Sequence, residues 1–404
     1  MKKVLTFLVL IILLPNPLHA QDQPSDDGLV EEFYPDGALK SQNQYNHGKL
    51  EGISKTYYPN GRLLSEGRYK SGQIDGTYKS YYDSGQLYLV KEFKDGLLEG
   101  ESLEYYPGGQ IKSRENYQSD ELNGSSLYYF EDGNLQYSME FKNGRLDGMS
   151  REYFEGGVLK SEALYENENL EGIVKEWDKN GKLEASWRYE KGLRQELSQI
   201  YYPNGKLKWE AGFKDDQISG ISTAYSEDGT LVMKSSFKDG RLNGLVQEFY
   251  PDGTVKIETN YKDDQKHGVT HEYYPNGTLS LEREFKDGED IGNSFEYYED
   301  GTIRISRRYA NKNRDGTLEE FYLGSQLKQR WTINNAQLDG PSQSYYKTGE
   351  LMSEEQYKSG AKDGVSKYYH QNGNLAFEDT YSQGKRKTRK SFDGRGEFIS
   401  EIKE

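Results

Sequence analysis

Ten tyrosines recur at one position of a 24-residue period, and rings at this spacing could stack on sugars or anchor a protein partner. Each follows another aromatic position in most repeats, so the two sets of rings should project from opposite faces of a strand. The structural alternative is cross-strand aromatic pairing, which would stabilise a sheet by about 0.2–1 kcal/mol per pair. The candidate binding residues of this tyrosine ladder are Tyr34, Tyr58, Tyr82, Tyr106, Tyr202, Tyr250, Tyr274, Tyr298, Tyr322 and Tyr346.

Residues suited to metal binding or acid–base catalysis are sparse. His267 and His271 are four apart, which is metal-ligand spacing only on a helix, and Gly268 indicates a turn that leads into a strand. The pair Asp215-Asp216 stands where other repeats have Asp-Gly, which is typical of a turn. No Ser-His-Asp set, phosphate loop or dinucleotide fingerprint appears in the sequence. We therefore predict a protein that is not an enzyme and has no metal site and no cofactor.

The 24-residue period extends over nearly the whole chain and sets the elements that must position the tyrosines. Steps of 24 from Gly37 to Gly373 reach a glycine every time except at Ser325. A second series with the same period begins at Gly28 and is interrupted only at Glu196. A register held without insertion over this length predicts an array of about fifteen copies of one small unit. Arrays of this kind usually bind along a surface and rarely carry one catalytic pocket.

One unit, residues 29–52, predicts a β-hairpin. Tyr34-Pro35-Asp36-Gly37 is typical of a turn in which proline presets φ and glycine takes the left-handed position. A three-residue loop that ends in a G1 bulge would put Phe33 opposite Leu39. Successive hairpins should pair edge to edge. The predicted fold class is therefore all-β, an elongated antiparallel β-meander of about fifteen 24-residue hairpin repeats.

Alternation along the hairpin predicts one core face. Leu39 and Tyr45 are an even number of residues apart and share a face, which Phe33 should join through the turn. Gln42 points the other way, and its position is mostly polar in other repeats. The position of Glu31 fits this scheme poorly, because it should face the core but holds Lys or Arg in several repeats.

The first 20 residues have the pattern of a secretory signal peptide. Lys2 and Lys3 precede an apolar run, and cleavage is expected after Ala20. The chain has no cysteine, which excludes lipoprotein anchoring and disulfide stapling. We expect an exported protein that is periplasmic, envelope-associated or secreted. The other predicted segments are a lead-in at 21–28, the fifteen repeats at 29–388 and a C-terminal cap or tail at 389–404.

The composition limits the partners. A formal net charge of −15 argues against nucleic acid and against anionic membranes, because both carry negative charge. The mean hydropathy of −1.00 is low, but 35 Tyr and 15 Phe argue against disorder and favour a thin β structure. One basic cluster is interpreted as a solvated edge on the last strand or as a contact point for an acidic surface. It comprises Lys385, Arg386, Lys387, Arg389 and Lys390.

The repeated pattern Glu-Tyr-Tyr-Pro-Asp/Asn-Gly-x-Leu, followed by Tyr and two spaced glycines, resembles the MORN repeat in its bacterial variant form. Proteins dominated by this variant are often called YwqK-type antitoxin components. The resemblance covers residues 29–388. It implies an elongated antiparallel β-meander with roles in protein scaffolding and membrane association, and no catalytic chemistry in the repeat itself.

These observations favour a non-enzymatic, exported repeat scaffold that binds a protein partner, or associates with itself, through aromatic-rich sheet faces. One alternative is a glycan-binding or membrane-associated protein of the cell envelope. A second alternative is an antitoxin-like component, as the resemblance suggests. Retention on isolated cell wall would indicate a glycan binder, whereas a stable complex in pull-downs would indicate a scaffold.

Overall fold

The computed structural model describes residues 27–310 and 314–404, and within them the protein is all-β. These residues form 36 strands and no helix, so the part of the chain that is described has no helix able to cross a bilayer. Within each unit the strands pair antiparallel with their neighbours in chain order. The predicted fold class, an antiparallel meander of hairpin repeats, is confirmed. The predicted signal peptide at 1–20 lies outside the described residues.

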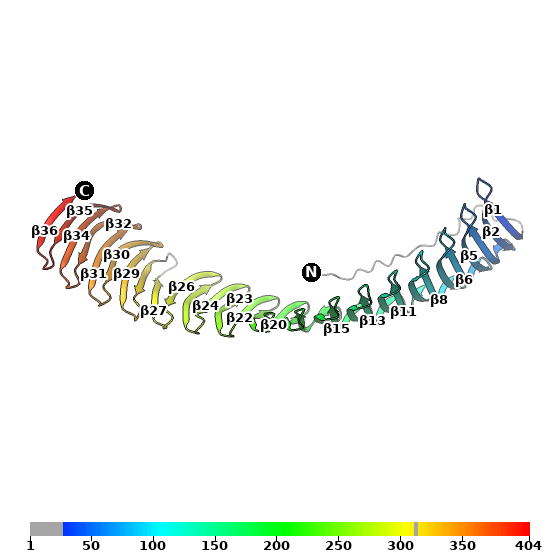
Figure 1. Ribbon diagram of the computed structural model, residues 1–404, viewed down its shortest axis with the longest axis horizontal. Coiled ribbons are helices and arrows are strands. Elements are labelled where there is room, and N and C mark those ends of the chain that lie inside the picture. The colour runs from blue at the N-terminus through cyan, green and yellow to red at the C-terminus, as the bar shows by residue number, and fades with distance from the viewer. Residues whose placement is uncertain (1–26, 311–313) are drawn as a thin grey trace. The chain divides into compact units, whose positions relative to one another are not determined.

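The chain divides into two compact units, each of which is described by itself. Figure 1 shows the hairpins of each unit following one another in a single layer. The first unit contains residues up to Glu171 and Lys179–Gly181. Its strands are β1 (Gly28–Phe33), β2 (Leu39–Asn46), β3 (Lys49–Leu50), β4 (Gly52–Tyr57), β5 (Leu63–Lys70), β6 (Gln73–Tyr81), β7 (Leu87–Lys94), β8 (Leu97–Tyr105), β9 (Ile111–Gln118), β10 (Glu121–Leu122), β11 (Gly124–Tyr129), β12 (Leu135–Lys142), β13 (Arg145–Tyr153) and β14 (Leu159–Glu166).

The second unit contains Gly172–Asp178 and Lys182–Glu404, and β15 (Asn169–Trp177) spans the division. The strands of the second unit that follow are β16 (Leu183–Glu190), β17 (Leu193–Arg194), β18 (Glu196–Tyr201), β19 (Leu207–Lys214), β20 (Gln217–Tyr225), β21 (Leu231–Lys238), β22 (Arg241–Phe249), β23 (Val255–Lys262), β24 (Gln265–Tyr273), β25 (Leu279–Lys286), β26 (Glu289–Tyr297), β27 (Ile303–Tyr309), β28 (Gly316–Phe321), β29 (Leu327–Asn334), β30 (Gln337–Tyr345), β31 (Leu351–Lys358), β32 (Ala361–Lys362), β33 (Gly364–Tyr369), β34 (Leu375–Ser382), β35 (Lys385–Phe392) and β36 (Phe398–Lys403).

The first turn of each repeat has the predicted geometry. In the first hairpin the amide of Gly37 donates to the carbonyl of Tyr34 at 2.9 Å, and the amide of Tyr34 donates to the carbonyl of Ala38 at 2.8 Å. Gly37 has a φ of 86°, which is the left-handed conformation that glycine adopts at little cost. Phe33 pairs with Leu39, so this prediction is confirmed.

The assignment of side chains to the two faces differs from the prediction, because the bulge leaves one residue unpaired. Glu32 pairs with Ser41 and Phe33 pairs with Leu39, so the register skips Lys40. The extra residue moves Phe33 and Leu39 to the face opposite Tyr45. The predicted common face for these residues is therefore wrong. Glu31 no longer stands out, because it lies on the same face as Phe33 and not on the core side.

Side-chain hydrogen bonds define this polar face, which carries the positions of Glu31, Phe33 and Gln42. The Gln42 amide donates to Glu31 Oε1 at 2.7 Å, and the Tyr57 hydroxyl, one repeat after Phe33, donates to Gln42 Oε1 at 2.9 Å. The same bonds recur in later repeats, for example from the Tyr273 hydroxyl to Glu258 Oε2 at 3.2 Å. Charged and amide side chains thus belong on this face throughout the array.

The opposite side, which we call the core face, carries the positions of Val30, Ser41, Asn43 and Tyr45. It buries small side chains under aromatic rings. A Cβ added at Gly67 would lie 3.0 Å from the ring of Tyr78 and 3.4 Å from the ring of Tyr69. Close ring packing explains why many buried residues at the Val30 position have small hydroxyl side chains: Ser102, Ser126, Ser198, Ser222, Thr270, Ser294, Ser342 and Ser366.

The C-terminal residues continue the pattern of hairpins. β35 pairs with β34 on one side and with β36 on the other. The segment 389–404, expected as a cap or tail, therefore contains the end of β35 and all of β36. The basic cluster between 385 and 390 lies on β35, which is not the last strand, so its predicted place on a terminal edge is wrong.

Candidate functional site

The tyrosine ladder joins each repeat to the next. All ten hydroxyls donate to a main-chain carbonyl 23 residues further along the chain, at 2.7 to 3.2 Å. The acceptor is the last residue of the next repeat's first strand, for example Tyr273 for the hydroxyl of Tyr250. All ten rings are half-buried. This geometry gives the ladder a structural role through its hydroxyls, and a role in ligand binding stays a prediction.

The rings of several ladder tyrosines are covered on one side by the residue six positions later. The ring of Tyr82 lies 5.0 Å from the ring of Tyr88, and the ammonium groups of Lys208, Lys256 and Lys328 lie 5.4 to 6.0 Å from ladder rings. Cations over aromatic faces are attractive interactions that hold both side chains in place. One side of four ladder rings is therefore occupied by a neighbouring side chain.

An open hollow on the core face of the second unit gathers apolar and aromatic side chains from β16, β18, β19, β20 and the turn after β18. We call it the tryptophan hollow. The rings of Trp209 and Phe213 meet edge to face, 6.2 Å apart and inclined at 68°. The apolar and aromatic lining comes from Trp187, Ile200, Tyr202, Trp209, Phe213 and Ile218.

Two cations lie in the same hollow. The Arg194 guanidinium lies 4.5 Å from the ring centre of Phe213 and 5.9 Å from that of Trp187. Its Nε is 3.5 Å from Oδ1 of Asp216, and its backbone amide donates to the same oxygen at 3.0 Å. Lys208, on the strand of Trp209, places its ammonium over Tyr202. An apolar wall with positive charges is suited to binding a ligand through packing and charge together.

The comparisons with known proteins place this chain in a family. The family model described as "MORN repeat variant" matches twelve segments, which together cover more than half of the chain: 26–47, 50–71, 74–95, 98–119, 122–143, 146–167, 170–191, 197–215, 242–263, 266–287, 338–359 and 362–383. The chain belongs to the MORN repeat variant family. The predicted resemblance to this repeat is thereby confirmed. A match of this kind indicates a repeat scaffold.

No curated protein matches the chain. Solved structures similar to it include "Crystal Structure of TcdB2-TccC3-Cdc42", with 11% identity, a TM-score of 0.16, and coverage of 90% of this chain and 22% of that chain. A structure of the Photorhabdus luminescens Tc holotoxin pore shows 12% identity and a TM-score of 0.16, and covers 94% of this chain and 24% of that chain. This chain thus spans about a quarter or less of the length of those chains.

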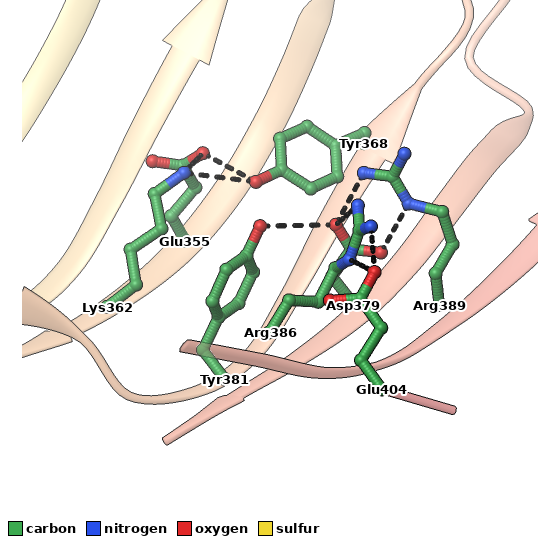
Figure 2. Close-up of polar contacts among 8 residues, drawn as sticks. All are labelled: Glu355, Lys362, Tyr368, Asp379, Tyr381, Arg386, Arg389 and Glu404. Atoms are coloured by element: carbon green, nitrogen blue, oxygen red, sulfur yellow. Dashed lines mark hydrogen bonds and ion pairs between the residues drawn. The ribbon is translucent and has the colours of Figure 1, made fainter. Parts of the chain in front are cut away.

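The last MORN repeats contain a cluster of charges on the core face, drawn in Figure 2. Asp379 is completely buried and accepts hydrogen bonds from Nε and Nη2 of Arg389 at 2.7 and 2.6 Å. Arg386 lies 4.0 Å from the same carboxylate and also pairs with Glu404. The hydrogen bond with Asp379 raises the pKa of Arg389, so this guanidinium stays charged.

A second part of the cluster in Figure 2 is equally well paired. Glu355 accepts from Nζ of Lys362 at 2.6 Å and from the hydroxyl of Tyr368 at 2.9 Å. Burial lowers the pKa of Lys362, but the hydrogen bond and charge of Glu355 raise it, and the net shift is upward. Arg386, Arg389 and Lys390 of the predicted basic cluster each pair with a carboxylate of this chain. Their charge is thus neutralised by intramolecular pairs, as a structural role requires.

The first unit contains a similar but smaller cluster around Glu115. The hydroxyls of Tyr117 and Tyr128 both donate to the carboxylate of Glu115, which occupies the same repeat position as Glu355. Burial, followed by the charge of Glu115, raises the pKa of both tyrosines. Nearby, burial lowers the pKa of Lys91. These polar groups thus satisfy one another inside the described part of the core face.

His267 and His271, which are four residues apart in the sequence, contact different carboxylates. His271 Nε2 is 3.3 Å from Glu282, and His267 Nδ1 is 3.3 Å from Asp287. Across residues 27–310 and 314–404, no group of three or more metal-ligating side chains is placed to hold an ion.

The tryptophan hollow was not predicted from the sequence. Its signal was present, because the chain has four tryptophans and two of them lie in this hollow. A second signal was Arg194, which stands where most repeats of the first half have Leu or Ile before the second glycine. The residues that differ from the repeat pattern, and not the repeated tyrosines, are therefore the sequence features that indicate this site.

A substitution at one rung tests the structural role of the ladder. Tyr250→Phe keeps the ring but removes the bond to the Tyr273 carbonyl, so we expect a loss of about 0.5–1.5 kcal/mol in local stability. The measurement is hydrogen exchange of amides in β22 to β24. Tyr261→Phe is the matched control, because its hydroxyl has no hydrogen-bond partner among the described residues. Equal protection in the two variants would contradict the structural role.

Buried tyrosines predict a loss of stability at alkaline pH. Burial raises the pKa of Tyr69, Tyr117 and Tyr128 above the ordinary value of 10.0, so unfolded chains release these protons first as the pH rises. The stabilisation is complete below pH 10 and is lost above it. Urea unfolding midpoints followed from about pH 8 to pH 11 should fall beyond pH 10, and less steeply in Tyr128→Phe. A midpoint that stays constant over this range would refute the prediction.

Proposed function

We propose that this protein is a non-enzymatic scaffold that binds a protein partner through the core face of its second unit, at the tryptophan hollow. The observation that carries the proposal is the gathering of Trp187, Trp209 and Phe213 in an open hollow beside Arg194. Tryptophan, tyrosine and arginine dominate the binding energy of protein interfaces when they line a desolvated centre. The repeats supply the rigid sheet on which these side chains are held.

The contacts of the remaining polar groups support a scaffold rather than an enzyme. The buried carboxylates Glu355 and Asp379 and the half-buried Glu115 are each paired with a tyrosine hydroxyl or a cation of the same chain. General acid–base catalysis needs a titratable group within hydrogen-bonding reach of a substrate. The hollow instead offers aromatic walls and cations, which are groups suited to binding.

The shape of the hollow favours a protein side chain over a sugar ring. Trp209 and Phe213 are inclined to one another and form a cornered wall, whereas a sugar stacks on a flat, open ring. A glycan- or membrane-binding role and an antitoxin-like role are therefore alternatives to the scaffold that we propose. Retention on isolated cell wall that Trp209→Ala abolishes would reverse the order of scaffold and glycan binder.

A cross-linking experiment in producing cells tests the proposed site. We expect wild-type protein to form one abundant cross-linked complex, and Trp209→Ala to reduce its yield at least about tenfold, as for the loss of a central aromatic anchor. Trp177→Ala is the matched control, since Trp177 pairs with Leu183 at the position of Phe33 on the polar face. A complex that forms equally well with Trp209→Ala, with the circular dichroism unchanged, would overturn the site.

We further propose that the scaffold is exported, on the basis of the charged and apolar segments within residues 1–20. The measurement is N-terminal sequencing of the chain recovered from fractionated cells. We expect Gln21 as the first residue, in the periplasmic, envelope or secreted fraction. An intact Met1 in the cytoplasmic fraction would contradict export and would leave the binding site unaffected.

A further inference from the structure

Ion pairs recur on the core face at the bulges of several hairpins. In five repeats the cation at the unpaired bulge residue contacts a glutamate eight residues earlier. The distances for Lys40–Glu32, Lys112–Glu104, Lys160–Glu152 and Lys328–Glu320 are 3.2, 2.7, 2.6 and 2.8 Å, and Arg304 pairs with Glu296 in the same way. In these five repeats the glutamate supplies a carboxylate to the cation at the bulge.

The bulge cation of the tryptophan hollow has no glutamate at the corresponding position. Lys208 occupies the bulge position, but the residue eight positions earlier is Ile200. Lys208 is exposed and forms no ion pair with any residue of the described chain; its ammonium lies 5.4 Å from the ring centre of Tyr202. Ile200 itself lines the hollow. Replacement of the glutamate by an apolar side chain thus adds to the apolar wall and leaves a cation beside it.

The charges of the hollow are not balanced. Arg194 and Lys208 contribute two positive charges, whereas Asp216 is the single carboxylate that lines the hollow in the described chain. Asp216 is shared between the backbone amide and the guanidinium of Arg194, and its distance from Arg194 Nε is long, at 3.5 Å. The chain as a whole has a net charge of −15, so the excess of positive charge in the hollow is opposite in sign to the charge of the protein. It is complementary to an anionic ligand.

We propose that the tryptophan hollow recognises an acidic, apolar peptide segment of a protein partner. A bulky apolar side chain of that segment packs against Trp187 and Trp209, and an adjacent carboxylate pairs with Lys208. This inference rests on the proposed function and names the chemistry of the partner. The inclined rings favour a peptide over an acidic polysaccharide, because a sugar stacks on a flat, open ring.

A random peptide display library panned on the full chain tests the proposal. We expect the enriched peptides to combine aspartate or glutamate with large apolar residues, and not to be retained by a variant carrying Trp187→Ala and Trp209→Ala. Absence of enrichment over that double variant, or enrichment without acidic residues, would overturn the inference. Polygalacturonate is the acidic polysaccharide probe, and its binding at the hollow in place of peptides would also overturn it.

Charge reversal gives the sharper measurement. Lys208→Glu should weaken binding of a selected peptide at least about tenfold, and the difference should shrink as salt is raised. Lys256→Glu is the matched control, because Lys256 occupies the same repeat position beside Tyr250 but does not line the hollow. Equal affinities of the Lys208→Glu variant and wild type would refute the acidic recognition. If the cross-linked complex still required Trp209 in that case, the proposed function would stand and the inference alone would fall.

Discussion

The hydrogen bond from a tyrosine hydroxyl to the main-chain carbonyl 23 residues later is the interaction that fixes the array. A hairpin has no core of its own, so each repeat depends on its neighbour for packing. The bond joins a turn to the end of the next repeat's first strand, as between Tyr250 and Tyr273. Its length depends on an unchanged repeat length, because an insertion between donor and acceptor would move the carbonyl away. The 24-residue period keeps donor and acceptor within hydrogen-bonding distance in the ten repeats that have this tyrosine.

The bulge near the first turn determines which chemistry each face of the sheet can carry. By leaving Lys40 unpaired, it places Phe33 and Leu39 with Gln42, and places the Lys40 side chain near Glu32. One face then holds carboxylates and amides that accept bonds from aromatic hydroxyls. The other face holds small residues under aromatic rings. At the tryptophan hollow, the departures on the second face are exchanges of residue at fixed repeat positions, such as Ile200 in place of glutamate.

The sequence was sufficient to predict the elements and their order. The turn residues from Tyr34 to Gly37 identified the hairpin, and the period identified the array, because both depend on local backbone preferences. The face assignment of Phe33 failed, since a bulge shifts alternation by one residue and nothing in the alternation reveals its place. The bond of the Tyr34 hydroxyl to Tyr57 was missed for another reason. It joins positions 23 apart, and only the pairing of successive hairpins brings them together.

The candidate site could be predicted only in part, because the sequence does not show which departures from the repeat pattern are compensated by a partner within the chain. Asp379 departs from the uncharged majority at its position, but Arg389 neutralises it from within the chain. Lys362 neutralises Glu355 in the same way. These exchanges come in compensating pairs and leave the array internally satisfied. At Lys208 the partner position holds Ile200, and no other side chain of the described residues replaces the missing carboxylate. An uncompensated departure costs the isolated chain stability that pairing would supply, and selection tolerates such a cost where a ligand provides the missing group.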